Sequence, residues 1–254
     1  MDLSALDHLA AAAAALAAGA VNAVAGGGTL ITFPALAAVG VPAKTANTTN
    51  AVALCPGYFG GTWAQRGDLL GQRRRSIVLG IAGFFGGLCG AFLLLASSER
   101  LFRQVVPFLI LLACGLLGFQ GPIRKLIPVR SSASGDTVPG PVAVVSTFAT
   151  SIYGGYFGAG IGIMFLAILG LLLPEPLRRV NAVKQLLSFV INVTAATVFV
   201  LRGHVAWTLV AVMAPAALVG GNLGGRVAQR LDANRLRTVV VVLGVAAAVR
   251  MLTS

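Results

Sequence analysis

Long apolar stretches separated by short polar segments run through the whole chain, and their lengths predict membrane-spanning helices. Apolar runs cover residues 45–64, 76–96, 101–119, 180–201, 205–223 and 236–252. A helix needs about 20 apolar residues to cross a bilayer, whereas the strands of an outer-membrane barrel show alternating segments of about ten residues. The pattern therefore predicts an all-α fold, that of a polytopic membrane protein.

Two further apolar stretches, 6–41 and 141–173, are too long for a single crossing at about 1.5 Å per residue. Glycines interrupt both of them, at 26–28 in the first stretch and around 158–162 in the second. We expect each stretch to enter the membrane, break at its glycines and return to the side from which it came. Each half would then hold one V-shaped element followed by three spanning helices.

The two halves carry short matches in the same order, which indicates an internal repeat. The matches pair Gly26-x-Gly28 with Gly158-x-Gly160, Pro42 with Pro174, Asn50 with Asn181 after a one-residue shift, and Arg66-Gly67 with Arg202-Gly203. A polar linker over 121–140 separates the halves. The predicted organisation is a first transmembrane repeat over 1–120, a cytoplasmic linker over 121–140 and a second transmembrane repeat over 141–254.

Lysine and arginine gather in three polar segments, at 65–75, in the linker and at 226–237. Short basic segments of membrane proteins stay in the cytoplasm. All three segments reach the cytoplasmic side only if each V-shaped element returns to its own side, and the second half then begins on the side opposite to the first. This arrangement is an inverted repeat, which many secondary transporters share.

Composition narrows the function classes. The chain is 57% hydrophobic and 10% charged with a net charge of +12, and its mean hydropathy is +0.90. The basic residues lie in loops, so we expect no nucleic-acid partner. The three cysteines lack paired spacing and the two histidines stand far apart, so we expect no metal and no cofactor. Every Asp and Glu lies in a loop or near a helix end, which argues against a proton or sodium relay built on a buried carboxylate.

The glycine breaks are candidate anion sites. A broken helix frees backbone polar groups, which lipid tolerates only where protein or a wet cavity surrounds them. The limb that follows each break would present amide groups and a partial positive charge at its N-terminus, a combination that favours anions. The candidate donors are Gly26, Gly27, Gly28 and Thr29 in the first half and Gly158, Gly160 and Ile161 in the second. Close helix packing is the alternative role for these glycines.

Polar side chains open the helix that follows each broken element. In the second half Asn181, Lys184, Gln185, Ser188 and Asn192 share one helix face. Lys184 would supply a countercharge for a buried anion, or else extend its ammonium to the membrane surface. In the first half Asn47, Thr48 and Asn50 would line the same cavity, or Asn47 or Thr48 would cap the helix. Asn22 and Gln185 are weaker binding candidates.

Two motifs carry a family resemblance. They are Asn22-x3-Gly26-Gly27-Gly28-Thr29-Leu30-Ile31-x-Phe33-Pro34 followed by Asn47-Thr48-Thr49-Asn50, and Gly154-Gly155-Tyr156-Phe157-Gly158-x-Gly160-x-Gly162 followed by Asn181-Ala182-x-Lys184. In these motifs the chain resembles the TauE/SafE sulfite exporter family, also called the toluene-sulfonate uptake permeases, over essentially its whole length. The resemblance implies a bacterial protein of the cytoplasmic membrane that moves small sulfur-containing or organic anions.

The residues and the resemblance together predict a secondary transporter of a small anion. Asn50 and Asn181 would bind the oxygens of the anion, and Lys184 would neutralise its charge. An anion channel would use the same donors without alternating access, and a non-transporting membrane scaffold would need neither Asn181 nor Lys184. No Ser/His/Asp set, HExxH motif or paired carboxylate supports an enzyme. The expected partners are the small anion and the lipid bilayer, and the glycine faces would also permit a homodimer.

Overall fold

The computed structural model describes residues 3–24, 27–128, 136–227 and 233–253. Over these residues the chain is helical with no strand, which confirms the all-α fold. The first half contains α1 (Ala5–Val24), α2 (Thr29–Ala38), α3 (Ala43–Ala64), the short 3₁₀ helix η1 (Arg66–Leu69), α4 (Arg73–Ala96) and α5 (Glu99–Gly118). The second contains α7 (Pro141–Tyr156), α8 (Ile161–Leu172), α9 (Leu177–Arg202), α10 (Trp207–Val227) and α11 (Ala233–Thr253), and α6 (Gln120–Leu126) stands between them.

The helices are long and apolar enough for a multi-pass membrane protein. Four of them, within Ala5–Asn22, Arg73–Ala96, Glu99–Gly118 and Leu177–Arg202, have the length and composition of membrane spans. Many large apolar side chains remain exposed on α4, α5 and α11, as expected of surfaces that face lipid tails rather than water. The helix α6 and the short 3₁₀ helix η1 are the elements that the sequence pattern did not predict, because both lie in polar segments between the apolar runs.

Both long glycine-containing stretches are broken at the predicted places. The first divides into α1 and the ten-residue α2, and the second into α7 and the twelve-residue α8. At the second break Gly158 and Gly160 have φ of 78° and 73°, a left-handed backbone that residues with a side chain rarely adopt. The break therefore depends on glycine at these two positions.

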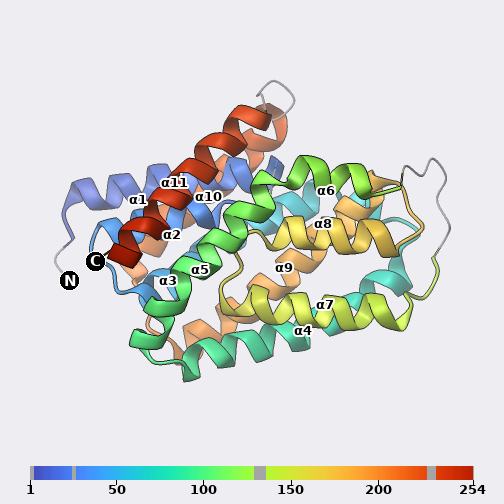
Figure 1. Ribbon diagram of the computed structural model, residues 1–254, viewed down its shortest axis with the longest axis horizontal. Coiled ribbons are helices and arrows are strands. Elements are labelled where there is room, and N and C mark those ends of the chain that lie inside the picture. The colour runs from blue at the N-terminus through green and yellow to red at the C-terminus, as the bar shows by residue number, and fades with distance from the viewer. Residues whose placement is uncertain (1–2, 25–26, 129–135, 228–232, 254) are drawn as a thin grey trace.

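Helices of one half pack against helices of the other (Figure 1). The first helix of each half packs on the penultimate helix of the other, since α1 contacts α10 and α7 contacts α4. The helices α3 and α9 pack against each other, and so do α5 and α11. Both marked chain ends lie at one end of the molecule, whereas α6 and the start of α7 lie at the opposite end (Figure 1).

Small residues make the contact between α4 and α7 unusually close. A Cβ atom built on Gly90 would lie 2.1 Å from the carbonyl oxygen of Ile152, and one built on Gly155 would lie 2.2 Å from that of Gly87. Such distances leave no room for any side chain, so backbone packs directly on backbone, as in many membrane helix pairs. This contact fixes the position of α7, whose C-terminal end leads into the second break.

Candidate functional site

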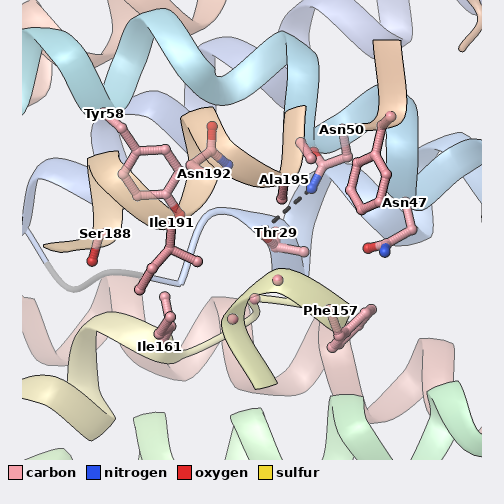
Figure 2. Close-up of a pocket in the computed structure, with 15 residues that line it drawn as sticks. Thr29, Asn47, Asn50, Tyr58, Phe157, Ile161, Ser188, Ile191, Asn192 and Ala195 are labelled. Atoms are coloured by element: carbon pink, nitrogen blue, oxygen red, sulfur yellow. Dashed lines mark hydrogen bonds between the residues drawn. The ribbon is translucent and has the colours of Figure 1, made fainter. Parts of the chain in front are cut away.

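A small buried pocket lies where the two broken elements meet the helices α3 and α9 (Figure 2). Its cavity volume is about 20 Å³. The lining residues are Thr29 from α2, Asn47, Asn50, Ala51 and Tyr58 from α3, Gly154, Gly155, Phe157, Gly158 and Ile161 from the α7–α8 break, and Ser188, Ile191, Asn192, Ala195 and Phe199 from α9. A cavity of this volume holds about one water molecule. Both halves of the chain contribute to it.

The start of α2 forms the first wall of the pocket. The side-chain amide of Asn50 donates to the hydroxyl of Thr29 at 3.3 Å, and the hydroxyl of Thr32 donates to the side-chain oxygen of Asn50. These bonds tie α3 to the first turn of α2. One amide hydrogen of Asn50 bonds Thr29, so the other remains available to a guest in the pocket.

The second break forms the opposite wall, with Phe157 and Ile161 facing Thr29 across the pocket (Figure 2). The amide of Asn47 donates to the backbone carbonyl of Tyr156, the last residue of α7, at 2.9 Å. The hydroxyl of Tyr153 donates to the carbonyl of Ala159 at 2.6 Å. Helix α3 therefore contacts both breaks, through Asn50 at the first and Asn47 at the second.

The first-turn amides are less available than the sequence predicts. The amides of Leu30 and Ile31 donate to the carbonyls of Gly27 and Gly28 at 3.0 and 2.9 Å. At the second break the amide of Ile161 donates to Gly158 at 3.3 Å, and that of Ile163 to Gly160 at 3.0 Å. Tight turns at both helix starts thus engage several of the groups expected to be unpaired. Side chains therefore contribute more of the free polar groups in the pocket than the backbone does.

Asn22 engages another of these amides, because its side-chain oxygen accepts a hydrogen bond from the Gly28 amide at 2.8 Å. The side chain of Asn22 is buried and bridges α1 to the turn before α2. Neither Asn22 nor Gly28 lines the pocket. Asn22 thus stabilises the first break, and its position is that of a structural support behind the pocket wall.

Two polar groups on α9 face the pocket without a hydrogen-bond partner among the described residues. The hydroxyl of Ser188 and the side-chain oxygen of Asn192 are both buried and unbonded. A buried polar group without a partner costs about 1–3 kcal/mol, so such groups point to a missing ligand or water. Figure 2 shows both residues projecting from α9 on the side of Tyr58 and Ile191.

Lys184 lies one helical turn before Ser188 on the same face of α9. It is buried, with only 4% of its surface exposed. Within the described part of the chain neither an ion pair nor a hydrogen bond engages its side chain. Lys184 does not line the cavity itself but flanks it.

The structure separates several other predicted site residues from the pocket. Asn181 donates to the side-chain oxygen of Gln65 at 2.7 Å, and Thr48 donates to the carbonyl of His204 at 2.5 Å. Gln185 packs against Gly61 of α3, and Gly27 lies beside Leu117 of α5. Gly160 stands against Ala113 of α5 rather than in the pocket. Gly26 lies outside the described residues.

One sequence interpretation is wrong. Asn47 and Thr48 do not cap α3, because that helix begins after Pro42 and both residues fall in its second turn. The helix starts also give a pairing of the halves that differs from the short matches, because α9 begins after Pro176 and not after Pro174. Counted from the two helix starts, Asn47 matches Asn181 and Asn50 matches Lys184. Equivalent positions of α3 and α9 are counted from the first residue of each helix, and the short matches could not show where each helix begins.

The apolar wall of the pocket could not be predicted from the sequence. Tyr58, Phe157 and Phe199 look like ordinary core residues in a chain this hydrophobic, so nothing in the sequence distinguishes them. The glycines Gly154 and Gly155 appear in the family motif, and the polar stripe on α9 includes Ser188 and Asn192. The sequence did indicate Ser188 and Asn192 as pocket residues, because they fall on the same face of α9 as Lys184.

An all-α membrane protein with a buried polar pocket between two glycine-broken helices has the architecture of a membrane transporter. The chain belongs to the TauE/SafE sulfite exporter family, whose model matches residues 11–251. It is 30% identical to a "Probable membrane transporter protein" of Haemophilus influenzae, over 88% of this chain and 86% of that protein. It is 24% identical to "Probable membrane transporter protein YfcA" of Escherichia coli (94% and 87% covered) and 26% identical to "Probable membrane transporter protein ORF9" of Sinorhizobium sp (94% and 90%).

Proposed function

We propose that this protein is a secondary transporter that moves a small anion, such as sulfite or a sulfonate, across the bacterial cytoplasmic membrane. The anion would bind in the pocket between the two breaks. The observation that carries the proposal is the pair of unbonded polar side chains on α9, Ser188 and Asn192, one turn and two turns beyond the buried Lys184. The Ser188 hydroxyl donates a hydrogen bond and the Lys184 ammonium supplies opposite charge, whereas the unbonded oxygen of Asn192 only accepts and so suits a protonated oxygen of the guest or a water molecule.

The charges around the pocket suit an anion. No Asp or Glu lines it, and among the described residues no carboxylate forms an ion pair with Lys184. A buried ammonium without a counterion is costly, and an anionic guest would offset that cost. Amide donors of Asn47 and Asn50 on the opposite side would bind further oxygens of the same guest.

The small size of the cavity favours a transporter over a channel. A volume of about 20 Å³ holds about one water molecule, so a sulfite ion enters only if the walls move apart. Walls that belong to both halves separate when one half rocks against the other, which is the motion expected of an inverted repeat. The exchanged packing of α1 on α10 and of α7 on α4 supports such a repeat, because related halves would form equivalent contacts.

Flux through proteoliposomes tests the proposal. The purified protein is reconstituted, labelled sulfite is followed, and sulfonates and oxalate serve as competitors. We expect saturable flux, inhibition by competitors and exchange of internal for external anion. Flux that stays proportional to concentration and shows no exchange would favour the anion channel. Flux of none of these anions would contradict the proposed substrate class.

Substitutions at Lys184 test the role of the countercharge in the same assay. Lys184→Gln should raise the half-saturating concentration by roughly 10- to 100-fold, since hydrogen bonds to charged groups contribute about 1.5–3 kcal/mol. Lys184→Arg should retain much of the affinity because it keeps the charge. The matched control is Lys125→Gln on the exposed surface of α6, which should leave flux unchanged. Equal flux in wild type and Lys184→Gln would refute this role.

A further inference from the structure

Tyr58 carries the largest of the polar side chains that line the pocket. It lies on α3 about two turns beyond Asn50, and only 7% of its surface is exposed. Figure 2 shows its ring on the side of the pocket where Ser188 and Ile191 project from α9. A phenolic hydroxyl both accepts and donates hydrogen bonds, and a buried tyrosine usually has a partner for it. The partners of Tyr58 therefore indicate what this side of the pocket binds.

The oxygen of the Tyr58 hydroxyl has a partner in Asn22, whose side chain forms a hydrogen bond with it. The side-chain oxygen of Asn22 accepts from the Gly28 amide at 2.8 Å, so its amide nitrogen is the group that donates to Tyr58. Close packing holds Asn22 in this position, because a Cβ atom built on Gly28 would lie 2.7 Å from that nitrogen. The Tyr58 hydroxyl thus accepts a hydrogen bond from the side of the first break.

The hydrogen of the Tyr58 hydroxyl has no acceptor within the described part of the chain. Tyr58 lines the pocket, so this hydrogen can be donated to a guest there. The Ser188 hydroxyl, on the neighbouring helix α9, also lines the pocket without a bonded partner among the described residues. One hydroxyl from each half of the chain can therefore donate to the same guest.

We infer that the Tyr58 hydroxyl donates a hydrogen bond to the transported anion and that Asn22 positions the hydroxyl for this role. The inference rests on the proposed function, because the acceptor is the anion of that proposal. A hydrogen bond from a hydroxyl to a charged oxygen is shorter and stronger than one to a neutral acceptor. Tyr58 adds such a donor from α3, on the side of the pocket where α9 supplies Ser188.

The hydrogen bonds then form a chain that runs from the Gly28 amide through Asn22 and Tyr58 to the anion. Each bond in such a chain polarises the next and strengthens it. Gly28 directly precedes α2, so the affinity for the anion depends on the geometry of the first break. Coupling of this kind is reciprocal, and an anion in the pocket therefore stabilises the first break.

Nuclear magnetic resonance of the full-length protein in lipid tests the hydrogen bond directly. The chain contains three tyrosines, Tyr58, Tyr153 and Tyr156, so isotopic labelling at Cζ, the carbon that carries the hydroxyl, gives one resonance for each. We expect the Tyr58 resonance, assigned by its absence in Tyr58→Phe, to shift as sulfite is added, whereas the other two stay. A constant Tyr58 resonance in protein that transports sulfite would overturn the inference, and water would then be the partner of the hydroxyl.

Flux through proteoliposomes measures what the hydroxyl contributes to affinity. Tyr58→Phe removes only the hydroxyl and should raise the half-saturating concentration of sulfite about tenfold. The matched control is Tyr156→Phe, which should leave that concentration unchanged, because the Tyr156 hydroxyl lies 3.3 Å from that of Ser97 and outside the pocket. Saturable wild-type flux with the same half-saturating concentration in Tyr58→Phe would overturn this inference alone. A wild type that neither transports sulfite nor shifts the Tyr58 resonance would overturn the proposed function as well.

Asn22→Ala distinguishes a positioning role from a purely structural one. It should weaken sulfite binding in the wild type but add little to the loss in Tyr58→Phe, because Asn22 acts on the anion through Tyr58. Equal losses in the two backgrounds would contradict the positioning role. Hydrogen exchange at the Gly28 amide provides a second readout that needs no substitution of Asn22. Sulfite should increase the protection of this amide in the wild type and not in Tyr58→Phe, and equal protection in both would also contradict the role.

Discussion

The guanidinium of Arg75 lies 2.9 Å from the carboxylate of Glu175, and both side chains are completely buried. Arg75 belongs to the first turn of α4, whereas Glu175 stands in the turn between α8 and α9. The ion pair therefore joins the two halves of the chain. The guanidinium of Arg75 also donates hydrogen bonds to the side chains of Gln72 at 2.8 Å and Thr137 at 2.9 Å.

Glu175→Gln should lower the free energy of unfolding by about 3–5 kcal/mol, because it leaves the charge of Arg75 buried without its carboxylate. Unfolding of the detergent-solubilised protein by heat or denaturant would measure the change. The control is Asp68→Asn, which removes the Arg178–Asp68 pair at 2.8 Å, in which Arg178 is largely exposed. That pair should contribute no more than about 1 kcal/mol. Equal effects of the two substitutions would contradict the assigned importance of the buried pair.

Gly90→Ala should destabilise the protein by about 1–3 kcal/mol, because the added methyl group would meet the backbone of α7. The matched control is Gly80→Ala in the same helix, where a Cβ atom meets nothing within 4 Å. Alanine there should stabilise α4 by roughly 0.5–1 kcal/mol. Thermal unfolding of both variants tests the prediction, and a Gly90→Ala protein as stable as wild type would show that α4 and α7 are not in direct backbone contact.

Ser188→Ala and Asn192→Leu should separate stability from transport. The Ser188 hydroxyl and the Asn192 side-chain oxygen have no hydrogen-bond partner among the described residues, so apolar replacements should leave the unfolding temperature unchanged or raise it. If these groups bind the anion, the half-saturating concentration should rise roughly tenfold in each variant. Thr197→Val on the same helix is the control, because its exposed hydroxyl only bonds the Val193 carbonyl at 2.8 Å. Wild-type affinity in both pocket variants would place the anion elsewhere.

Asp136 should make the start of α4 sensitive to acid. Both of its carboxylate oxygens accept a hydrogen bond from the Arg74 amide at 3.0 Å. This bond is the main cause that lowers the pKa of Asp136 below its ordinary value of 3.8. A lowered pKa in the folded protein means that the ionised form stabilises the fold, fully above pH 3.8 and progressively less as the pH falls through the lowered pKa.

Hydrogen exchange at the amides of Arg74 and Arg75 measures this effect. Protection in wild type should exceed that in Asp136→Ala at neutral pH, and the difference should disappear in acid below the lowered pKa. Ser98→Ala provides a comparison without a titrating group, since Ser98 caps α5 through a hydrogen bond to the Leu101 amide at 3.1 Å. Its effect on protection at the start of α5 should not vary with pH. A pH-independent effect of Asp136→Ala would contradict the prediction.

The sequence predicts the helices well because their signals are local. Apolar length identifies the spans, and the glycines locate both breaks, down to the limb that starts at Thr29 and the one that starts at Ile161. The short matches between the halves are less informative about register. The matches do not show that α3 begins after Pro42 and α9 after Pro176. A helix start depends on backbone geometry, which identical residues in two segments do not reveal.

The pocket was only partly predictable. Thr29, Asn47, Asn50, Gly158 and Ile161 line it as expected. The break itself brings Thr29, Gly158 and Ile161 to the pocket, whereas Asn47 and Asn50 reach it from the helix that follows the first broken element. Tyr58 and Phe199 come from other helical turns, and only tertiary packing shows that they reach the same cavity. Asn181 satisfies its amide with Gln65 instead, a partner that no periodicity in α9 indicates.

Asn50 and Lys184 stand eight residues after the proline that precedes their helices, so one half offers a neutral amide where the other offers a cation. If the halves exchange their exposure during transport, the exchange moves a charge relative to the membrane field. A full elementary charge moved across 100 mV corresponds to about 2.3 kcal/mol. The inward-facing and outward-facing conformations would then differ in free energy, and the membrane voltage would set which direction of transport is faster.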